Sequence, residues 1–179
     1  MRRAGADPLA GVERVLVDGS NLAFALARGS GGGPRPSAAV IASVRAAFPA
    51  SVRVELVFDG TGEVGLGRAG TFARAASNLY VEHSGRRSAD RVIEGAVATQ
   101  LAADGPAGTW GILVVTDDRE LRGLVQARGA RVAGTAWLAG RLARVAGAGS
   151  GSGARSGTGI GHRRPPRPPG GDRPPRSSR

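Results

Sequence analysis

The chain has 179 residues, a formal net charge of +11 and no cysteine. This length is typical of one folded domain with appendages, and the missing cysteines exclude disulfides and thiolate metal sites. No apolar run is long enough to span a bilayer, and the amino-terminal segment lacks the apolar stretch of a secretory signal, so we expect a cytoplasmic protein without a membrane partner.

The positive charge is divided between two parts of the chain. All 25 basic residues are arginine; residues 1–146 hold 18 of them against 13 acids (+5), and residues 147–179 hold seven against one (+6). The second part is nearly all Gly, Ser, Arg and Pro, which cannot bury enough apolar surface to fold. We predict a disordered leader at residues 1–11, a domain at 12–146 and a disordered tail at 147–179. The tail is either only a solvated segment or an electrostatic tether to a polyanion.

Apolar runs alternate with helical patterns along the domain. Runs at 12–17, 52–58, 79–82, 111–115 and 129–133 are predicted to be strands. The helices between them are expected to begin at Ser20 or Asn21, Ser37, Ser88, Asp117 or Asp118, and Thr135. Glycine-rich loops are expected at 29–36 and 60–70, and a helical turn at 71–76. This alternation predicts a three-layer α/β/α, Rossmann-like domain with a mostly parallel sheet of about five strands.

Acidic side chains recur where the predicted strands end or the next helices begin. They are Asp18, Asp59, Asp90, Asp118 and Glu120. Because ligands bind at the carboxyl ends of the strands in an open α/β sheet, we expect these acids on one rim. Each has an ordinary explanation as a turn or helix-start residue. Together, however, two carboxylates about 6 Å apart would repel by roughly 3 kcal/mol at a dielectric near 20, and a divalent cation would remove that cost.

Oxygen ligands without cysteine favour Mg²⁺ or Mn²⁺, which polarises phosphate oxygens and activates water. Asp18 and Asp118 are the preferred ligands, followed by Asp90, with Glu120 acting through water. The remaining assignments are supporting ones. Asn21 binds the Asp18 carboxylate or a phosphate, Ser20 and Thr116 orient groups, and Asp59 ends its strand. Asp117 caps a helix, and Arg86 and Arg87 steer the polyanionic partner into the site. His83 is interpreted as structural, and Trp110 and Trp137 as packing residues rather than stacking platforms.

Four stretches carry a resemblance to a known family. Val-Asp-Gly-Ser-Asn-Leu at 17–22, Val-Phe-Asp-Gly at 57–60, Ser-Ala-Asp at 88–90 and Val-Val-Thr-Asp-Asp-Arg-Glu-Leu at 114–121 resemble the NYN branch of the PIN-like ribonucleases over residues 12–134. The resemblance implies a PIN-like sheet and a Mg²⁺- or Mn²⁺-dependent ribonuclease. It also implies that Asp18, Asn21, Asp90 and Asp118 form the site, with Glu120 where the family often has Asp.

Two other functions stay open on the sequence. One is a catalytically weak RNA-binding module, associated with ribosomes or tRNA, in which the acids hold only a structural ion. The other is a small-molecule phosphohydrolase, although no Asp-x-Asp follows the first strand. The RNA target, endo- or exonucleolytic action and the oligomeric state are left undecided.

Overall fold

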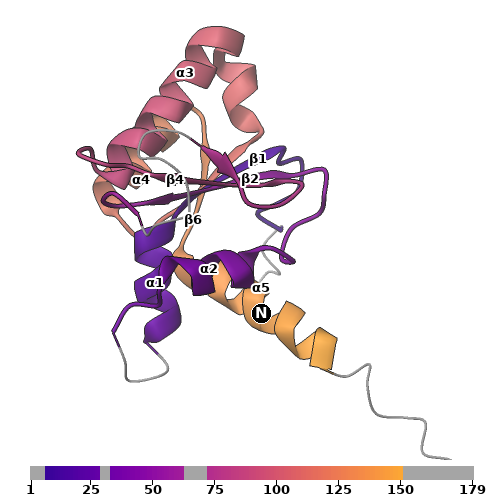
Figure 1. Cartoon of the computed structure of the whole chain (residues 1–179). Helices are drawn as coiled ribbons and strands as arrows, with labels where there is room; N and C mark the ends of the chain where they lie inside the picture. Colours follow the sequence, from indigo (N-terminus) through magenta and orange to yellow (C-terminus); the bar gives the residue numbers. More distant parts are fainter. Residues whose placement is uncertain (1–6, 29–32, 63–71, 151–179) are drawn as a thin grey trace, which may run out of the picture.

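The structure is a computed structural model that describes residues 7–28, 33–62 and 72–150 (Figure 1). Residues 1–6 of the predicted leader and 151–179 of the predicted tail lie outside the described residues. So do residues 29–32 and 63–70 of the two predicted loops, together with Thr71.

A six-stranded sheet forms the centre of the domain, one strand more than expected. Its order is β3 (Ala73–Arg74), β4 (Leu79–His83), β2 (Arg53–Phe58), β1 (Arg14–Asp18), β5 (Ile112–Val115) and β6 (Arg131–Ala133). All neighbouring strands are parallel except β3, which is antiparallel to β4. β1 lies between β2 and β5, so the strand order reverses there, which is where open α/β sheets form their ligand crevice.

Helices cover both faces of the sheet and complete the predicted three layers (Figure 1). α1 (Gly19–Ala27), α2 (Ser37–Val44) and α5 (Thr135–Ser150) pack on one face, and α3 (Ala89–Trp110) and α4 (Arg119–Ala127) pack on the other. None of the helices in the described segments has the length and apolar character needed to cross a membrane.

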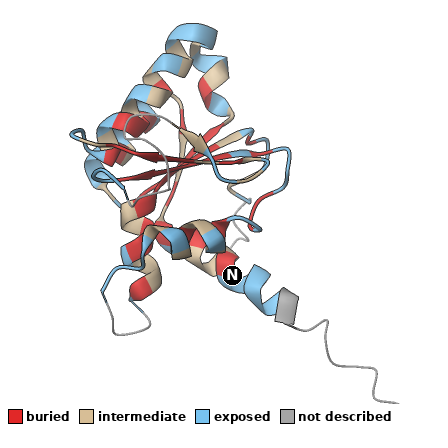
Figure 2. Cartoon of the chain, viewed as in Figure 1, coloured by how far each residue is buried: buried red, intermediate tan, exposed pale blue. Residues whose placement is uncertain are grey.

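The strands feed two hydrophobic cores because their side chains alternate between the two faces. In β1, Val15 and Val17 join the core under α1, α2 and α5, whereas Leu16 joins the core under α3 and α4. All three are fully buried. Figure 2 shows buried residues through the central strands, with exposure concentrated on the outer sides of the helices. Burial on both faces accounts for the continuous apolar runs of the sequence.

The bounds of several elements differ from the predicted ones. The predicted helical turn at 71–76 instead contains the two-residue strand β3. The sequence Asp104-Gly105-Pro106 predicts a helix end, and the helix does break there: Gly105 has a positive φ of 66°, and a second helical part of α3 then continues to Trp110. α5 runs to Ser150, past the predicted domain limit at residue 146. Residues 8–11 of the predicted leader form a turn, and Leu9 packs against the larger core.

Candidate active site

Asp18 ends β1 and is also the N-cap of α1, so the predicted cap at Ser20 or Asn21 is wrong. Its Oδ1 accepts the backbone N–H of Asn21 at 2.9 Å, and its Oδ2 accepts a short hydrogen bond from the Asn21 side-chain amide. Burial raises the pKa of Asp18, while the Asn21 hydrogen bonds oppose that rise. The side chain is thus a fixed carboxylate in a poorly solvated position.

The glycine of the Asp-Gly motif is required by packing. A Cβ at Gly19 would lie 2.7 Å from the Phe58 ring of β2, closer than real Cβ contacts allow. The ring of Phe58, the last residue of β2, therefore packs directly against the turn between β1 and α1. Asp18 itself pairs with Val57, so it stands beside the end of the neighbouring strand.

Thr116 connects the acids of β1 and of the segment after β5. Its buried hydroxyl donates to Asp18 Oδ2 at 3.4 Å and accepts the backbone N–H of Asp118 at 3.1 Å. The Asn21 amide also reaches the Thr116 hydroxyl at 3.4 Å. Asp18, Asn21, Thr116 and Asp118 are therefore joined in one hydrogen-bond network, although residues 18 and 118 are far apart in sequence.

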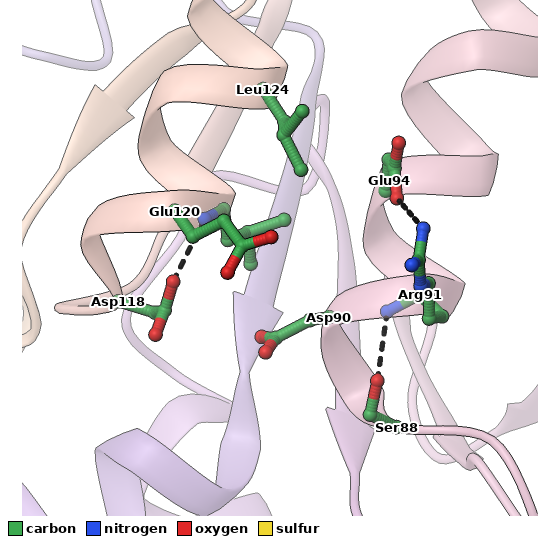
Figure 3. Close-up of a pocket in the computed structure, with 8 residues that line it drawn as sticks. Ser88, Asp90, Arg91, Glu94, Asp118, Glu120 and Leu124 are labelled. Atoms are coloured by element: carbon green, nitrogen blue, oxygen red, sulfur yellow. Dashed lines mark hydrogen bonds and ion pairs between the residues drawn. The ribbon is translucent and has the colours of Figure 1, made fainter.

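Asp118, Glu120 and Asp90 line a pocket of about 200 Å³ between the beginnings of α3 and α4 (Figure 3). Asp118 caps α4 by accepting the N–H of Leu121 at 2.8 Å, and Glu120 lies in the first turn. Asp90 lies in the first turn of α3, after the predicted cap Ser88. Figure 3 shows the Asp90 and Glu120 side chains extending toward each other from the two helices, with the Asp118 carboxyl at the start of α4.

The electrostatics of Asp90 indicate that the acids converge. Burial is the largest cause that raises its pKa from 3.8 to about 6. Other carboxylates add to the rise, in decreasing order those of Asp18, Asp118, Asp59 and Glu120. Each acid of the predicted rim thus acts electrostatically on one carboxyl group.

Asp59 has a structural role that fits its assignment as a supporting residue. Its Oδ1 accepts the N–H of Ala89 at 2.8 Å, and its own N–H donates to the Ser20 hydroxyl at 2.9 Å. These two bonds join the end of β2 to the beginnings of α3 and α1. Asp59 and Ser20 therefore fix the helices that carry Asp90 and Asn21.

Asp117 is a cap, as predicted, but for α5 rather than for α4. Its carboxylate accepts the N–H of Thr135 at 3.0 Å and a short hydrogen bond from the Thr135 hydroxyl. Burial alone would raise its pKa, but the Thr135 hydrogen bonds and the nearby Arg28 and Arg122 guanidiniums hold it below the usual value. Asp117 therefore serves the fold, while Asp118 faces the pocket.

The basic residues before Asp90 do not line the acidic pocket. Arg87 pairs with the buried Glu82 at 3.4 Å in a separate hollow over β4 and α3, and Arg86 is exposed. His83 is buried and stacks on Phe58, with ring centroids 5.5 Å apart, which agrees with a structural role. RNA steering by Arg86 and Arg87 stays a prediction.

The far wall of the pocket contains Arg91, Glu94 and Leu124, none of which was predicted as a site residue from the sequence. Glu94 accepts hydrogen bonds from Arg91 at 3.0 Å and from Arg128 at 2.9 Å. Glu94 lies four residues after Asp90 on the same helical face, a spacing that could have identified it. The link to Arg128 depends on the packing of α3 against α4 and has no sequence signal.

The donor chemistry fits a hard divalent cation. Among the described residues, no group of three or more Asp, Glu or His side chains stands at the spacing of a complete metal site. Mg²⁺ does not need such a group, because it is usually held by one or two carboxylates, with water and substrate phosphate completing the shell. Asp90 and Asp118, with Asp18 close behind, supply that number. Burial is the main cause of the raised pKa of Asp90, and a bound cation would relieve the further rise that the neighbouring carboxylates add.

Comparisons with known proteins bear on the fold. No protein-family model and no curated protein sequence matches the chain. Two crystal structures of Rae1 (YacP) from Bacillus subtilis are similar to it. One has 19% identity and a TM-score of 0.54, covering 78% of each chain; the other, of a mutant, has 18% identity and a TM-score of 0.50, covering 75% of this chain and 77% of that one. At these identities the likeness shows that the chain shares the α/β fold of Rae1.

Proposed function

We propose that the protein is a metal-dependent ribonuclease that hydrolyses RNA phosphodiester bonds with metal-activated water. The observation that carries this proposal is the convergence of Asp18, Asp90 and Asp118 at the reversal of strand order. Helix capping or turn formation can explain each of these acids when it is considered alone. It does not explain why acids from three separate segments should be gathered at a cost in electrostatic repulsion.

Each residue has a stated role in the proposal. Asp90 and Asp118 would hold Mg²⁺ or Mn²⁺ directly, Asp18 would add its negative charge from behind them, and Glu120 would bind through a water molecule. Bound there, the ion would lower the pKa of a water molecule and stabilise charge on a phosphate oxygen. The Asn21 amide holds the Asp18 carboxylate in one orientation, and the Thr116 hydroxyl keeps Asp18 and Asp118 in register.

Charge and pocket size favour a polymeric polyanion as substrate. The net charge of +11 attracts RNA in spite of the local acids. The acidic pocket, at about 200 Å³, is smaller than the roughly 300–1,000 Å³ of typical small-molecule sites. It therefore suits one phosphate of a strand that lies across the rim better than a whole enclosed metabolite.

One observation supports the alternative of a catalytically weak RNA-binding module, associated with ribosomes or tRNA. The described residues contain no complete group of three metal-binding side chains. In this alternative the arginines provide affinity, and the acids hold at most a structural ion.

Cleavage of labelled single-stranded RNA in Mg²⁺, Mn²⁺ or EDTA separates these functions. Asp118→Asn is the informative variant, because asparagine caps helices about as well as aspartate and should preserve α4. We expect metal-dependent cleavage by the wild type and its loss in the variant, with RNA affinity and thermal stability retained.

Asp104→Asn is the matched control, since Asp104 is exposed and lies far along α3 from the pocket. It should cleave like the wild type. Wild-type binding without cleavage in any metal would favour the RNA-binding module, and turnover of free nucleotides alone would favour a phosphohydrolase.

A further inference from the structure

Phe24 is an aromatic residue that the fold leaves in solvent beside the candidate site. Its relative exposure is 55%, and Trp110 and Val145 are the other exposed large hydrophobic residues in the described segments. It lies three residues after Asn21 and four after Ser20 in α1, so it shares their helical face. Phe24 follows Asp18 by six residues, which corresponds to about 9 Å along the helix axis.

Phe24 lines two surface hollows, and each hollow is also lined by a residue of the candidate site. One, of about 480 Å³, is lined by Asn21, Phe24 and Arg28 among others. The second, of about 180 Å³, is lined by Phe24 together with Ser20, Asp59 and Arg35. Phe24 therefore adjoins two hollows, and these also contain Asn21, Ser20 and Asp59, the residues that hold or support the acidic rim.

The charges around the ring suit a nucleotide strand. Arg28 and Arg35 line the two hollows and are both exposed. Arg28 pairs with Asp117 at 3.7 Å, with 71% of its side chain exposed. Such surface pairs contribute little, so the guanidinium can exchange that carboxylate for a phosphate. An aromatic ring flanked by arginines matches the way in which single-stranded nucleic acids are bound, by stacked bases and neutralised phosphates.

Trp110 provides the contrast. It is 66% exposed but lies directly before β5, at the edge of the sheet opposite to the strand carboxyl ends. It lines none of the hollows that contain site residues. Both residues therefore expose an aromatic ring, but of the two only Phe24 lies beside the acidic rim.

We propose that Phe24 is a stacking platform for one base of single-stranded RNA, close to the phosphate that occupies the acidic rim. This inference rests on the proposed ribonuclease function for its substrate class, and it names the strand state of that substrate. Duplex RNA keeps its bases stacked inside the helix, so it cannot place a base face on the ring. Arg28 and Arg35 bind the phosphates on either side of the stacked base.

The test is a binding measurement that does not depend on cleavage. A fluorescein-labelled 12-nucleotide single-stranded RNA is titrated in EDTA with protein that carries Asp118→Asn, and anisotropy gives Kd at several salt concentrations. A blunt duplex of the same sequence is titrated in parallel. Phe24→Ala should raise Kd for the single strand by roughly fivefold to 140-fold, since stacking on an aromatic side chain has that value per base. The loss should be the same at each salt concentration because no charge is removed.

Two further variants make the result specific. Phe24→Trp should bind the single strand at least as tightly as the parent, because it keeps the aromatic face, and Trp110→Ala should bind within twofold of it. Affinity for the duplex should not change with Phe24→Ala. Thermal unfolding should give equal Tm values for the parent and both Phe24 variants, since the ring is exposed.

Each outcome decides the inference. The inference would be overturned if Phe24→Ala left Kd unchanged, or if Trp110→Ala weakened binding as much. It would also be overturned if Phe24→Ala weakened duplex binding equally, or if the parent bound no RNA. The proposed ribonuclease function fails separately, in the wild-type cleavage assay. Stacking by Phe24 without any metal-dependent cleavage would leave this inference standing and assign the surface to an RNA-binding module.

Discussion

Asp90→Asn should stabilise the metal-free protein at neutral pH although it removes a candidate metal ligand. The folded state raises the pKa of Asp90 from 3.8 to about 6, chiefly through burial and secondarily through the neighbouring carboxylates. At pH 7.5 the wild type must therefore keep a charge that its surroundings disfavour. Asparagine has nearly the same shape and carries no charge, so the variant avoids that cost.

The size of the effect follows from the shift. A shift of about two units corresponds to an upper limit of about 3 kcal/mol at 1.36 kcal/mol per unit. Because Asp90 is partly exposed, water and salt screen its neighbours, and we discount this limit to about 1 kcal/mol. For a domain of this size, that gain in the free energy of unfolding corresponds to a rise in Tm of about 2–4 °C.

The pH dependence has a defined sign. Between about pH 4 and pH 6 the folded protein keeps the Asp90 proton, whereas the unfolded chain has released it. The unfolded state binds fewer protons, so the contribution of Asp90 to stability is complete below pH 4 and is lost as pH rises to 6. The difference in Tm between Asp90→Asn and wild type should therefore be small at pH 4 and grow until about pH 6.

Differential scanning calorimetry in EDTA from pH 4 to pH 8 measures this difference, with Asp104→Asn as a control that should follow the wild type. Added Mg²⁺ should then raise the Tm of the wild type more than that of Asp90→Asn, because a ligand bound only to the folded state stabilises it. A variant less stable than wild type at pH 7.5 in EDTA would refute the reasoning, and so would a difference that does not grow with pH.

Two further predictions concern the fold and the tail. Asp117→Ala removes the hydrogen bonds to Thr135 at the start of α5, so the free energy of unfolding should fall by about 0.5–2 kcal/mol in urea titrations; an unchanged midpoint would contradict the capping role. Removal of residues 150–179 takes away seven arginines, so the slope of log K for single-stranded RNA against log salt should become shallower by about 5. The rate of single-turnover cleavage at saturating protein should change little. Equal losses in binding and cleavage would mean that the tail belongs to the site.

The general architecture could be predicted because both sheet faces are covered. Residues such as Val15, Leu16 and Val17 are all buried, and the resulting apolar runs mark the strands clearly. The two-residue β3 carries no such run, since Ala73 and Arg74 pair only at the edge of the sheet. Boundaries at helix starts failed for a related reason: several polar residues in succession can cap, and tertiary contacts decide which one does.

The candidate site was predictable to the extent that topology determines it. Parallel strands bring Asp18 and the segment before Asp118 to the same edge, whatever the spacing between them in sequence. The remaining features of the site depend on how the helices pack. Side-chain bonds such as Arg128 with Glu94 depend on the angle between two helices, and the exposure of Phe24 depends on what α1 leaves uncovered.

Asp18 and Asp118 are each the N-cap of a helix. Capping explains why both positions carry a polar side chain, but it does not explain why that side chain is an ionisable carboxyl group. Asparagine or serine would serve a helix start about equally well, and at Asp18 burial works against the ionised form. The fold therefore does not require the negative charge of these two carboxylates. A set of amide replacements at these positions would separate the two contributions, leaving the scaffold intact and removing only what an incoming cation would recognise.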